Sequence, residues 1–269
     1  QTLVEFESWQ EDGIQLSEYW NVRRHVSCVE SQDMIAIVSA TDVAGRGYVR
    51  GPEGARAVVT EYLGEPSGVG RGPQMFLATY PAGSTIKPHF HRMDQFQIFV
   101  RGRATMGSES LTPVTIFYTD GVTPYGPIVG GEDGFAYFNL RGQPDLGGGI
   151  GWMPQDRALM VRRPGRALVA RTRLRIAEVH NPLRVEALLN PQDDGLAAYE
   201  LTAGPGVRLP DMNVAGGGRF DVVLAGSLEM NGRTLPLDSC TYASPGEQPP
   251  VRRAGPEGVH LIEVQLPTP

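Results

Sequence analysis

Short runs of apolar residues, separated by turns rich in glycine and proline, recur along the whole chain. The clearest runs lie at residues 34–40, 56–63, 74–80, 95–100, 114–118, 135–140, 197–203, 219–226, 241–244 and 258–266. Each has the length of a β-strand, and the 34 Gly and 22 Pro residues argue against long helices. The pattern predicts an all-β protein, built as a barrel or sandwich.

Several segments fit this pattern less clearly. Residues 157–161 and 167–179 also suggest strands, 182–190 suits a strand or a helix, and 15–21 allows a short helix. The glycine-rich stretch 142–151 interrupts the series of strands. We therefore expect two domains, residues 1–146 and 147–269, with the first domain carrying an N-terminal arm.

The two halves of the chain repeat each other. Pro88 corresponds to Pro210 at an offset of 122 residues, and QFQIFVRG (95–102) corresponds to RFDVVLAG (219–226) at an offset of 124. The second offset continues without a gap through Met106/Met230, Leu111/Leu235, Tyr118/Tyr242 and Gly134/Gly258. Coincident glycines and strands over such a run indicate a duplicated domain.

The candidate active centre is GSTIKPHFHRMDQFQIFVRG, residues 83–102. His89 and His91 stand two residues apart in a strand-like segment, so their side chains project to the same face. Neutral imidazole is the commonest protein metal ligand near neutral pH. The pair therefore predicts two metal ligands on one strand.

Strand alternation extends this site. If the two histidines point inward, Gln95, Gln97 and Phe99 are expected to do so as well. The neighbouring strand would add either Met75, Leu77 and Thr79 or Phe76, Ala78 and Tyr80. Apolar walls with a few convergent polar groups suit a small organic substrate.

The spacing in this segment resembles the first motif of the cupin superfamily, G-x5-H-x-H-x3/4-E-x6-G. Gly83, His89, His91 and Gly102 match it, and Gln95 stands where the motif has glutamate. The resemblance implies a bicupin: two antiparallel β-barrels of the double-stranded β-helix (jelly roll) type, duplicated.

The second cupin motif, P-x-G-x-x-H-x3-N, is matched weakly by DGVTPYGP (120–127). Aligned on Gly121, Tyr125 takes the place of the third histidine; aligned on Pro124 and Gly126, Val129 does. The resemblance thus implies His89, His91, Gln95 and Tyr125 as ligands of a divalent transition metal: Fe, Mn, Zn or Ni.

A metal-dependent enzyme acting on a small organic molecule with a carbonyl, enol or phenol group is the leading functional interpretation. Tyr125 and Gln97 are the candidate catalytic residues. The resemblance favours a dioxygenase slightly over a non-redox lyase, isomerase or cyclase. A non-catalytic cupin, in which His89 and His91 line an organic-ligand pocket, is the third hypothesis.

The second repeat lacks the histidines. Asp211 and Asn213 replace them, and Arg219 replaces Gln95. Because arginine has no lone pair to give a metal, we expect no metal in this domain. An alternative is that Arg219 anchors an anionic ligand.

The remaining charged residues, histidines and cysteines give no further site. The net charge of −6 does not favour nucleic-acid binding, and the arginine-rich stretch 162–175 is interpreted as a solvated or interdomain surface. His260 is expected to be a satisfied strand histidine, and His180 a strand-end residue. His25 could fold over the barrel mouth. Cys28 and Cys240 are expected to be free thiols.

The expected partners follow from composition. The sequence contains no run of 18 apolar residues, so no membrane span is expected. We expect a cytoplasmic protein that binds a small molecule and neither nucleic acid nor membrane, with a homodimer left open.

Overall fold

The computed structural model describes residues 34–64, 72–145, 149–160, 165–172, 183–212 and 216–268. The helix expected at 15–21 and the predictions for His25, Cys28, His180 and Asn213 fall outside these ranges. The chain divides into two units, Gln1–Glu30 and Ser31–Pro269, and everything below concerns the second.

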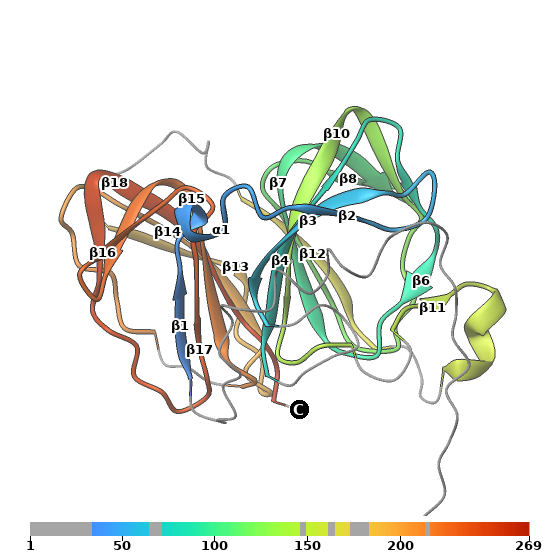
Figure 1. The fold of residues 1–269 in the computed structure, drawn as a ribbon. Coiled ribbons are helices and arrows are strands. Elements are labelled where there is room, and N and C mark those ends of the chain that lie inside the picture. The colour runs from blue at the N-terminus through green and yellow to red at the C-terminus, as the bar shows by residue number, and fades with distance from the viewer. Residues whose placement is uncertain are drawn as a thin grey trace, which may run out of the picture. The chain divides into compact units, whose positions relative to one another are not determined.

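Most of the described residues from the N-terminal half form a nine-stranded antiparallel sheet, here called the first sheet (Figure 1). Its order is β12-β9-β7-β10-β4-β3-β2, with β5 beside β10 and β8 beside β7. The strands are β2 (Tyr48–Arg50), β3 (Ala57–Leu63), β4 (Gln74–Tyr80), β5 (Thr85–Ile86), β7 (Gln95–Met106), β8 (Glu109–Leu111), β9 (Thr115–Thr119), β10 (Ile128–Arg141) and β12 (Ala167–Arg171).

A separate two-stranded ladder joins β6 (His89–Phe90) to β11 (Gly151–Trp152). Gly151 is required at this point, because a Cβ atom there would lie 2.1 Å from the Phe90 ring. The ladder therefore brings residues beyond position 146 directly against the strand that carries His89.

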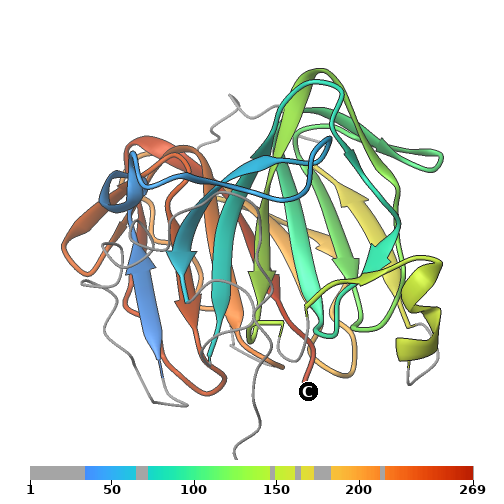
Figure 2. The same cartoon turned by 45° about the vertical axis from the view of Figure 1, so that its right-hand side comes forward.

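The second sheet is seven-stranded, with the order β1-β17-β15-β18-β14-β13 and β16 beside β15. Its strands are β1 (Ile35–Val38), β13 (Arg184–Leu189), β14 (Ala197–Ala203), β15 (Arg219–Met230), β16 (Arg233–Pro236), β17 (Cys240–Ala243) and β18 (Arg252–Gln265). Figures 1 and 2 show β1, in blue, beside the orange and red strands of this sheet.

The two sheets repeat one strand register. Gly102 pairs with Phe135 and Gln97 with Asn139 across β7 and β10; Gly226 pairs with Val259 and Asp221 with Glu263 across β15 and β18. All four pairs are related by the 124-residue offset. The ladders thus agree with the duplication predicted from sequence.

Gly102 and Gly226 show why glycines recur at matched positions. Their φ angles are 66° and 64°, in the left-handed region that favours glycine. A Cβ at Gly102 would lie 2.1 Å from the carbonyl oxygen of Gly134, and a Cβ at Gly226 would lie 2.1 Å from that of Gly258. Both repeats therefore bend the same long hairpin with the same close backbone approach.

Three apolar clusters hold the described residues together. One contains residues of both sheets, including Ile98 and Phe138 from the first and Val222 and Ile262 from the second. The other two each belong to one sheet: Phe99 and Phe117 lie in the first, and Leu261 lies in the second. Burial of these side chains supplies the main stabilisation of the fold.

Some sequence predictions change in detail. Residues 182–190 contain strand β13, whereas the strand expected at 157–161 is wrong: Gln155–Leu159 form a 3₁₀ helix. A short helix absent from the prediction, α1 (Ala40–Val43), begins after Ser39, which caps it. In the part of the chain that the structure describes, no helix is long and apolar enough to cross a membrane.

The sheets exchange strands across the expected domain boundary. β1 comes from the N-terminal half but pairs with β17, and β12 follows residue 146 but pairs with β9. The division into 1–146 and 147–269 stays a prediction, and these crossings show which segments such a division would separate from their pairing partners.

Candidate functional site

The structure brings the predicted site residues together at one end of the first sheet. His89 lies in β6, and His91 follows it directly. An isolated antiparallel bridge joins His89 to Tyr125, with their backbone N–H groups and carbonyl oxygens paired at 3.0 and 2.9 Å. Gln95 and Gln97 extend from the adjoining strand β7. All five side chains are less than one-tenth exposed.

Both imidazoles are oriented through Nδ1. His89 Nδ1 lies 2.8 Å from the carbonyl oxygen of Lys87, and His91 Nδ1 lies 2.6 Å from Asp145 Oδ2. A carbonyl and an ionised carboxylate can only accept, so Nδ1 carries the proton in each ring. Nε2 is therefore unprotonated in each ring, which is the tautomer that an Nε2 metal ligand requires.

The charge state of the pair follows from its surroundings. Burial lowers the pKa of His89 to about 4. Burial and the positive charge of Arg141 lower the pKa of His91 to about 3. Burial alone would raise the pKa of Asp145, but the hydrogen bond from His91 and the charge of Arg141 outweigh it and hold the pKa below its usual value. The site therefore holds two neutral imidazoles beside one carboxylate at neutral pH.

Arg141 is a buried cation that the sequence interpretation missed. Its guanidinium donates from Nε and Nη2 to Gln95 Oε1 at 3.0 and 2.9 Å, and from Nη1 to Gln74 Oε1 at 3.3 Å. Nη2 also lies 3.1 Å from His91 Nδ1, but two donors cannot share a hydrogen bond. Arg141 is thus held by amide oxygens and lies close to the carboxylate of Asp145 that pairs with His91.

Tyr125 is the centre of the polar network. Its hydroxyl lies 3.0 Å from His89 Nε2 and accepts hydrogen bonds from Gln95 Nε2 at 2.7 Å and Gln97 Nε2 at 3.1 Å. Because His89 Nε2 carries no proton, the hydroxyl donates its own proton to that nitrogen. Burial raises the pKa of Tyr125 above that of free tyrosine, so the phenol is neutral.

The observed register shows which of the two predicted sets of side chains on the neighbouring strand faces the site. Phe76, Ala78 and Tyr80 pack with Phe99 and Tyr125 on the side of the site, whereas Met75 and Leu77 pack in the cluster shared with the second sheet. Gln95, Gln97 and Phe99 share one face, as expected. Of the two alignments of the second motif, the structure places Tyr125 at the site, and Val129 is 39% exposed on β10.

Asn139, Arg141 and Asp145 are the site residues that sequence reasoning did not identify. Asn139 and Arg141 stand opposite Gln97 and Gln95 in the β10–β7 ladder. Asn139 and Arg141 alternate along the predicted strand 135–140 and its extension, which indicates that they share one face. This face could be assigned to the site only once the register between β7 and β10 was known. Asp145 lies in the glycine-rich stretch taken as a boundary, where no periodicity marks it.

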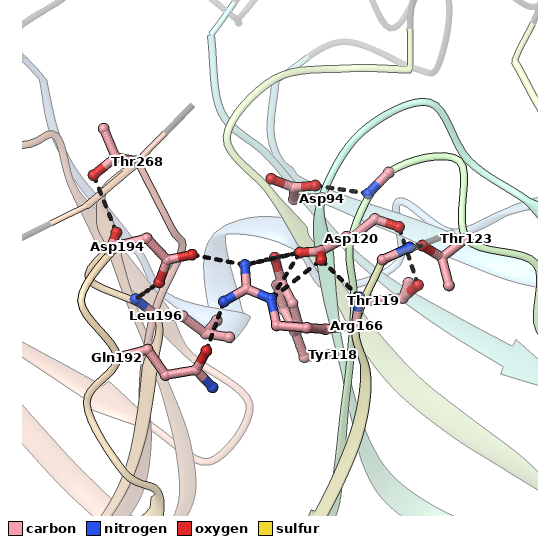
Figure 3. Close-up of polar contacts among 12 residues, drawn as sticks. Asp94, Tyr118, Thr119, Asp120, Thr123, Arg166, Gln192, Asp194, Leu196 and Thr268 are labelled. Atoms are coloured by element: carbon pink, nitrogen blue, oxygen red, sulfur yellow. Dashed lines mark hydrogen bonds and ion pairs between the residues drawn. The ribbon is translucent and has the colours of Figure 1, made fainter. Parts of the chain in front are cut away.

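Hydrogen bonds connect the turn before Tyr125 to two other chain segments (Figure 3). Asp94 Oδ1 accepts from the Gly121 N–H at 2.6 Å, and Asp120 accepts from Tyr118 and from both the backbone and the side chain of Arg166. Within the turn, Val122 has a φ of 63°, a left-handed conformation that is unfavourable for a β-branched residue. Its N–H donates to the carbonyl of His91 at 2.6 Å, so the strained turn connects the tyrosine and histidine segments.

Arg166 links this turn to a second chain segment. Nη2 lies 2.9 Å from Asp120 Oδ1 and 2.7 Å from Asp194 Oδ2, and Nη1 donates to Gln192 (Figure 3). Arg171 pairs with Glu109. These two members of the arginine-rich stretch therefore make ion pairs within the protein, in keeping with a surface that connects segments.

The matched positions of the second sheet are occupied by ion pairs. Arg252 Nη1 lies 2.9 Å from Asp221 Oδ1 and 2.8 Å from Glu263 Oε2, and Arg219 Nε lies 3.9 and 3.8 Å from the same carboxylates. All four side chains are at most 2% exposed. Arg219 also donates to the Met212 carbonyl, and Arg252 to the Pro210 carbonyl. The charge of Arg219 is thus balanced by residues of the protein itself.

Two further predictions can be compared with the structure. His260 is fully buried in β18, with Nε2 2.7 Å from Glu200 Oε1, which confirms a satisfied strand histidine. Cys240 is a buried free thiol, as expected. Asp211 is exposed.

Comparison with known proteins supports the fold. No family model matches the sequence, and no curated protein matches it. A putative dioxygenase from Nostoc punctiforme PCC 73102 aligns with a TM-score of 0.60 at 12% identity, covering 87% of this chain and 84% of that one. A nickel(II)-bound bacterial pirin from Escherichia coli aligns with a TM-score of 0.55 at 12% identity, covering 88% and 100%.

A third solved structure is salicylate 1,2-dioxygenase from Pseudoaminobacter salicylatoxidans with gentisate, with a TM-score of 0.54 at 11% identity, covering 93% and 86%. Together with the His89–His91 segment and the repeated register, these alignments decide the architecture. The protein has a duplicated cupin fold. At these identities, the likeness extends to the fold alone.

The donor groups of this site fit a divalent metal in part. His89 and His91 fit, because both Nδ1 atoms have acceptors and both Nε2 atoms are unprotonated, although the Tyr125 hydroxyl that donates to His89 Nε2 would have to turn away from it. Gln95 does not fit in its observed orientation, because its oxygen faces Arg141 and its N–H₂ group faces Tyr125. In the described residues, no three His, Cys, Asp or Glu side chains are grouped to hold a metal, so a third protein ligand would have to be another kind of oxygen donor, of which Tyr125 is the predicted one.

Proposed function

We propose that this cupin is a metal-dependent enzyme acting on a small organic molecule with a carbonyl, enol or phenol group, and that a dioxygenase is the first reaction class to test. The observation that carries the proposal is the matched orientation of His89 and His91. Hydrogen bonding of Nδ1 to a carboxylate or a carbonyl, with Nε2 left unprotonated, is the arrangement that supports metal-binding histidines.

The residues would divide the work as follows. His89 and His91 would hold the metal, and Tyr125 would be a third ligand or an acid–base group. A bound iron, manganese, zinc or nickel ion would supply Lewis-acid polarisation of a substrate oxygen or, with iron, O2 chemistry. Asp145 orients His91, and Arg141 holds Gln95 so that its amide nitrogen donates to Tyr125. Gln97 donates to the same phenol.

Two solved structures named as dioxygenases share the fold, which is the reason for placing O2 chemistry first. A second candidate is a non-redox lyase, isomerase or cyclase. It is favoured by the contact between Tyr125 Oη and His89 Nε2, since a phenol that donates to a neutral imidazole can pass a proton to or from a substrate.

Metal analysis tests the proposal most directly. The full chain, purified without added metal or chelator, is expected to contain close to one equivalent of a transition metal. His91→Ala should lose it, and Asp211→Ala, the matched change in the second repeat, should retain it. Trace metal in the wild type, with no uptake on titration, would contradict the metalloenzyme and favour a ligand-binding cupin. Loss of metal in Asp211→Ala would move the site to the other repeat.

Oxygen consumption separates the two reaction classes. With enols, diketones and catechols as probes, a dioxygenase should consume one O2 for each substrate converted. Conversion of a probe without O2 uptake, abolished by Tyr125→Phe, would instead support the proton-transfer enzyme.

A further inference from the structure

Two buried oxygens of the site have no hydrogen-bond partner. Among the described residues, Gln97 Oε1 and Asn139 Oδ1 are fully enclosed and accept nothing, although their amide nitrogens are hydrogen-bonded. Each side chain is 1% exposed. A buried acceptor left without a donor is unfavourable. Other described oxygens share this state, among them Glu263 Oε1 and Thr202 Oγ1 in the second sheet, but Gln97 and Asn139 are direct ladder partners within the proposed site.

The orientation of Asn139 is set by Arg141. A guanidinium can only donate, so Gln95 must turn its oxygen toward Arg141. That oxygen also receives Asn139 Nδ2 at 3.0 Å. Turning the Asn139 amide over would place two carbonyl oxygens against each other. Asn139 Oδ1 is therefore the atom that must remain without a donor from the protein.

The orientation of Gln97 follows from the hydrogen bonds that His89 and Tyr125 make. The Lys87 carbonyl takes the Nδ1 proton of His89, so His89 Nε2 takes the only proton of the Tyr125 hydroxyl. That hydroxyl has no second proton to offer Gln97, which must present its nitrogen and leave Oε1 unpaired. Two fixed ends, Arg141 and Lys87, thus determine both unpaired oxygens.

We propose that Gln97 Oε1 and Asn139 Oδ1 form a subsite that accepts hydrogen bonds from an O–H or N–H group of the ligand. Gln97 and Asn139 are direct partners across β7 and β10, so both amides stand side by side on one face. The inference rests on the site of the proposed function and narrows its substrate class: an enol or phenol supplies the required donor, whereas a ketone or ether does not.

Binding of two probes of similar size to the chelator-treated full chain tests this subsite. Phenol carries an O–H donor, and fluorobenzene carries fluorine in its place. Fluorine NMR follows fluorobenzene binding and its displacement by phenol. Phenol should bind about three- to tenfold more tightly, the range that one net neutral hydrogen bond supplies. Equal affinities, or no binding of either probe, would overturn the proposal.

Variants localise the effect. Gln97→Leu and Asn139→Leu should each reduce the preference for phenol, bringing the two probes toward equal affinity. Thr202→Val is the matched control, because Thr202 Oγ1 is also buried without a partner but lies in the second sheet. It should leave the preference unchanged. Should the leucine variants not fold, the comparison of probes on the wild type still decides.

The outcomes are independent of the metal. A phenol preference in protein that never takes up metal would support the subsite and contradict the metalloenzyme. Metal uptake without any phenol preference would do the reverse. A crystal structure with phenol that shows ordered water on both oxygens and the hydroxyl elsewhere would overturn the subsite.

Discussion

The same strand positions carry an amide network in the first sheet and an ion-pair network in the second. Gln95, Gln97, Asn139 and Arg141 correspond, in order, to Arg219, Asp221, Glu263 and Gln265 at the 124-residue offset. In the first sheet, one buried cation is held by amide oxygens and two acceptors remain unpaired. In the second sheet, two cations face two carboxylates.

This difference separates the proposed ligand site from an interior whose charged groups pair with one another, although Glu263 Oε1 there also accepts no hydrogen bond. In the second sheet, Arg219 and Arg252 also donate to the backbone carbonyls of Met212 and Pro210, in the segment that corresponds to the histidines. In the first sheet, that segment keeps two neutral imidazoles with unprotonated Nε2 atoms, and His89 Nε2 accepts from the Tyr125 hydroxyl. The two repeats share one register, and the four matched positions carry different polar side chains.

Breaking the second network is expected to have the largest effect. Arg252→Met leaves Asp221 and Glu263 facing only Arg219, and removal of one partner from a buried ion network costs about 3–5 kcal/mol. Urea denaturation measures the free energy of unfolding. Asp211→Ala, which changes an exposed residue, should shift it by less than about 0.5 kcal/mol. A small effect of Arg252→Met would show that the paired charges are not essential to the second sheet.

The histidine pair makes the metal-free protein less stable in acid. The folded-state pKa values of His89 and His91, about 4 and about 3, lie below the ordinary histidine value of 6.5. Between these limits the unfolded chain binds more protons, so stability falls as pH decreases. From pH 7 to 5, we expect a loss on the order of 1–2 kcal/mol for each histidine.

The measurement compares unfolding of wild type and His89→Gln across this range in the presence of chelator. The variant should lose the contribution of one histidine, giving a shallower dependence on pH. Parallel curves would contradict the buried neutral imidazole. Taking the difference removes the contributions of other groups, such as Glu61, whose pKa burial raises.

Replacing Asp145 tests how His91 is oriented without removing a proposed metal ligand. Asp145→Ala deletes the acceptor that orients His91, and loss of such a partner typically weakens metal binding by about 10–100-fold. Metal titration with a competing chelator measures the change. Asp145→Asn retains an oxygen acceptor and should recover part of the affinity. If Asp145→Ala binds metal as tightly as wild type, the carboxylate has no role in preparing His91.

The smallest effect is expected at Arg166. It is 30% exposed, and its partners Asp120 and Asp194 are 19% and 35% exposed, so solvent screens these ion pairs. Arg166→Gln should therefore cost about 1 kcal/mol or less in thermal or urea unfolding, well below Arg252→Met. A loss as large as that of Arg252→Met would show that the turn before Tyr125 depends on this link far more than its exposure indicates.

Much of the fold could be predicted because strand length and turn composition are local properties. The strands at 74–80 and 197–203 were predicted with the observed bounds. The short strand β11 was missed, because two residues carry no alternation. The 3₁₀ helix at Gln155–Leu159 was mistaken for a strand, since an apolar run alone does not distinguish the two.

The site was predicted in part for the same reason. His89 lies in β6 and His91 follows it directly, so two-residue spacing sufficed to place them together. Tyr125 was reached by an uncertain alignment, and Arg141 and Asp145 were not identified. Tyr125, Arg141 and Asp145 lie 36, 50 and 54 residues from their histidine partners, so their contacts depend on tertiary structure: the turn before β10, the register of β10 and the path of the chain after it.

The sequence by itself determined the strand series, the duplication and the histidine pair, because each can be recognised from the local spacing of residues or from the repeat. Only the tertiary structure decided the direction of the hydrogen bonds. Gln95 matches the position of a cupin ligand, yet Arg141, 46 residues away, takes its oxygen and turns its nitrogen toward Tyr125. A donor-only cation and an acceptor-only carbonyl, brought to opposite ends of one buried network, set the orientation of every amide between them.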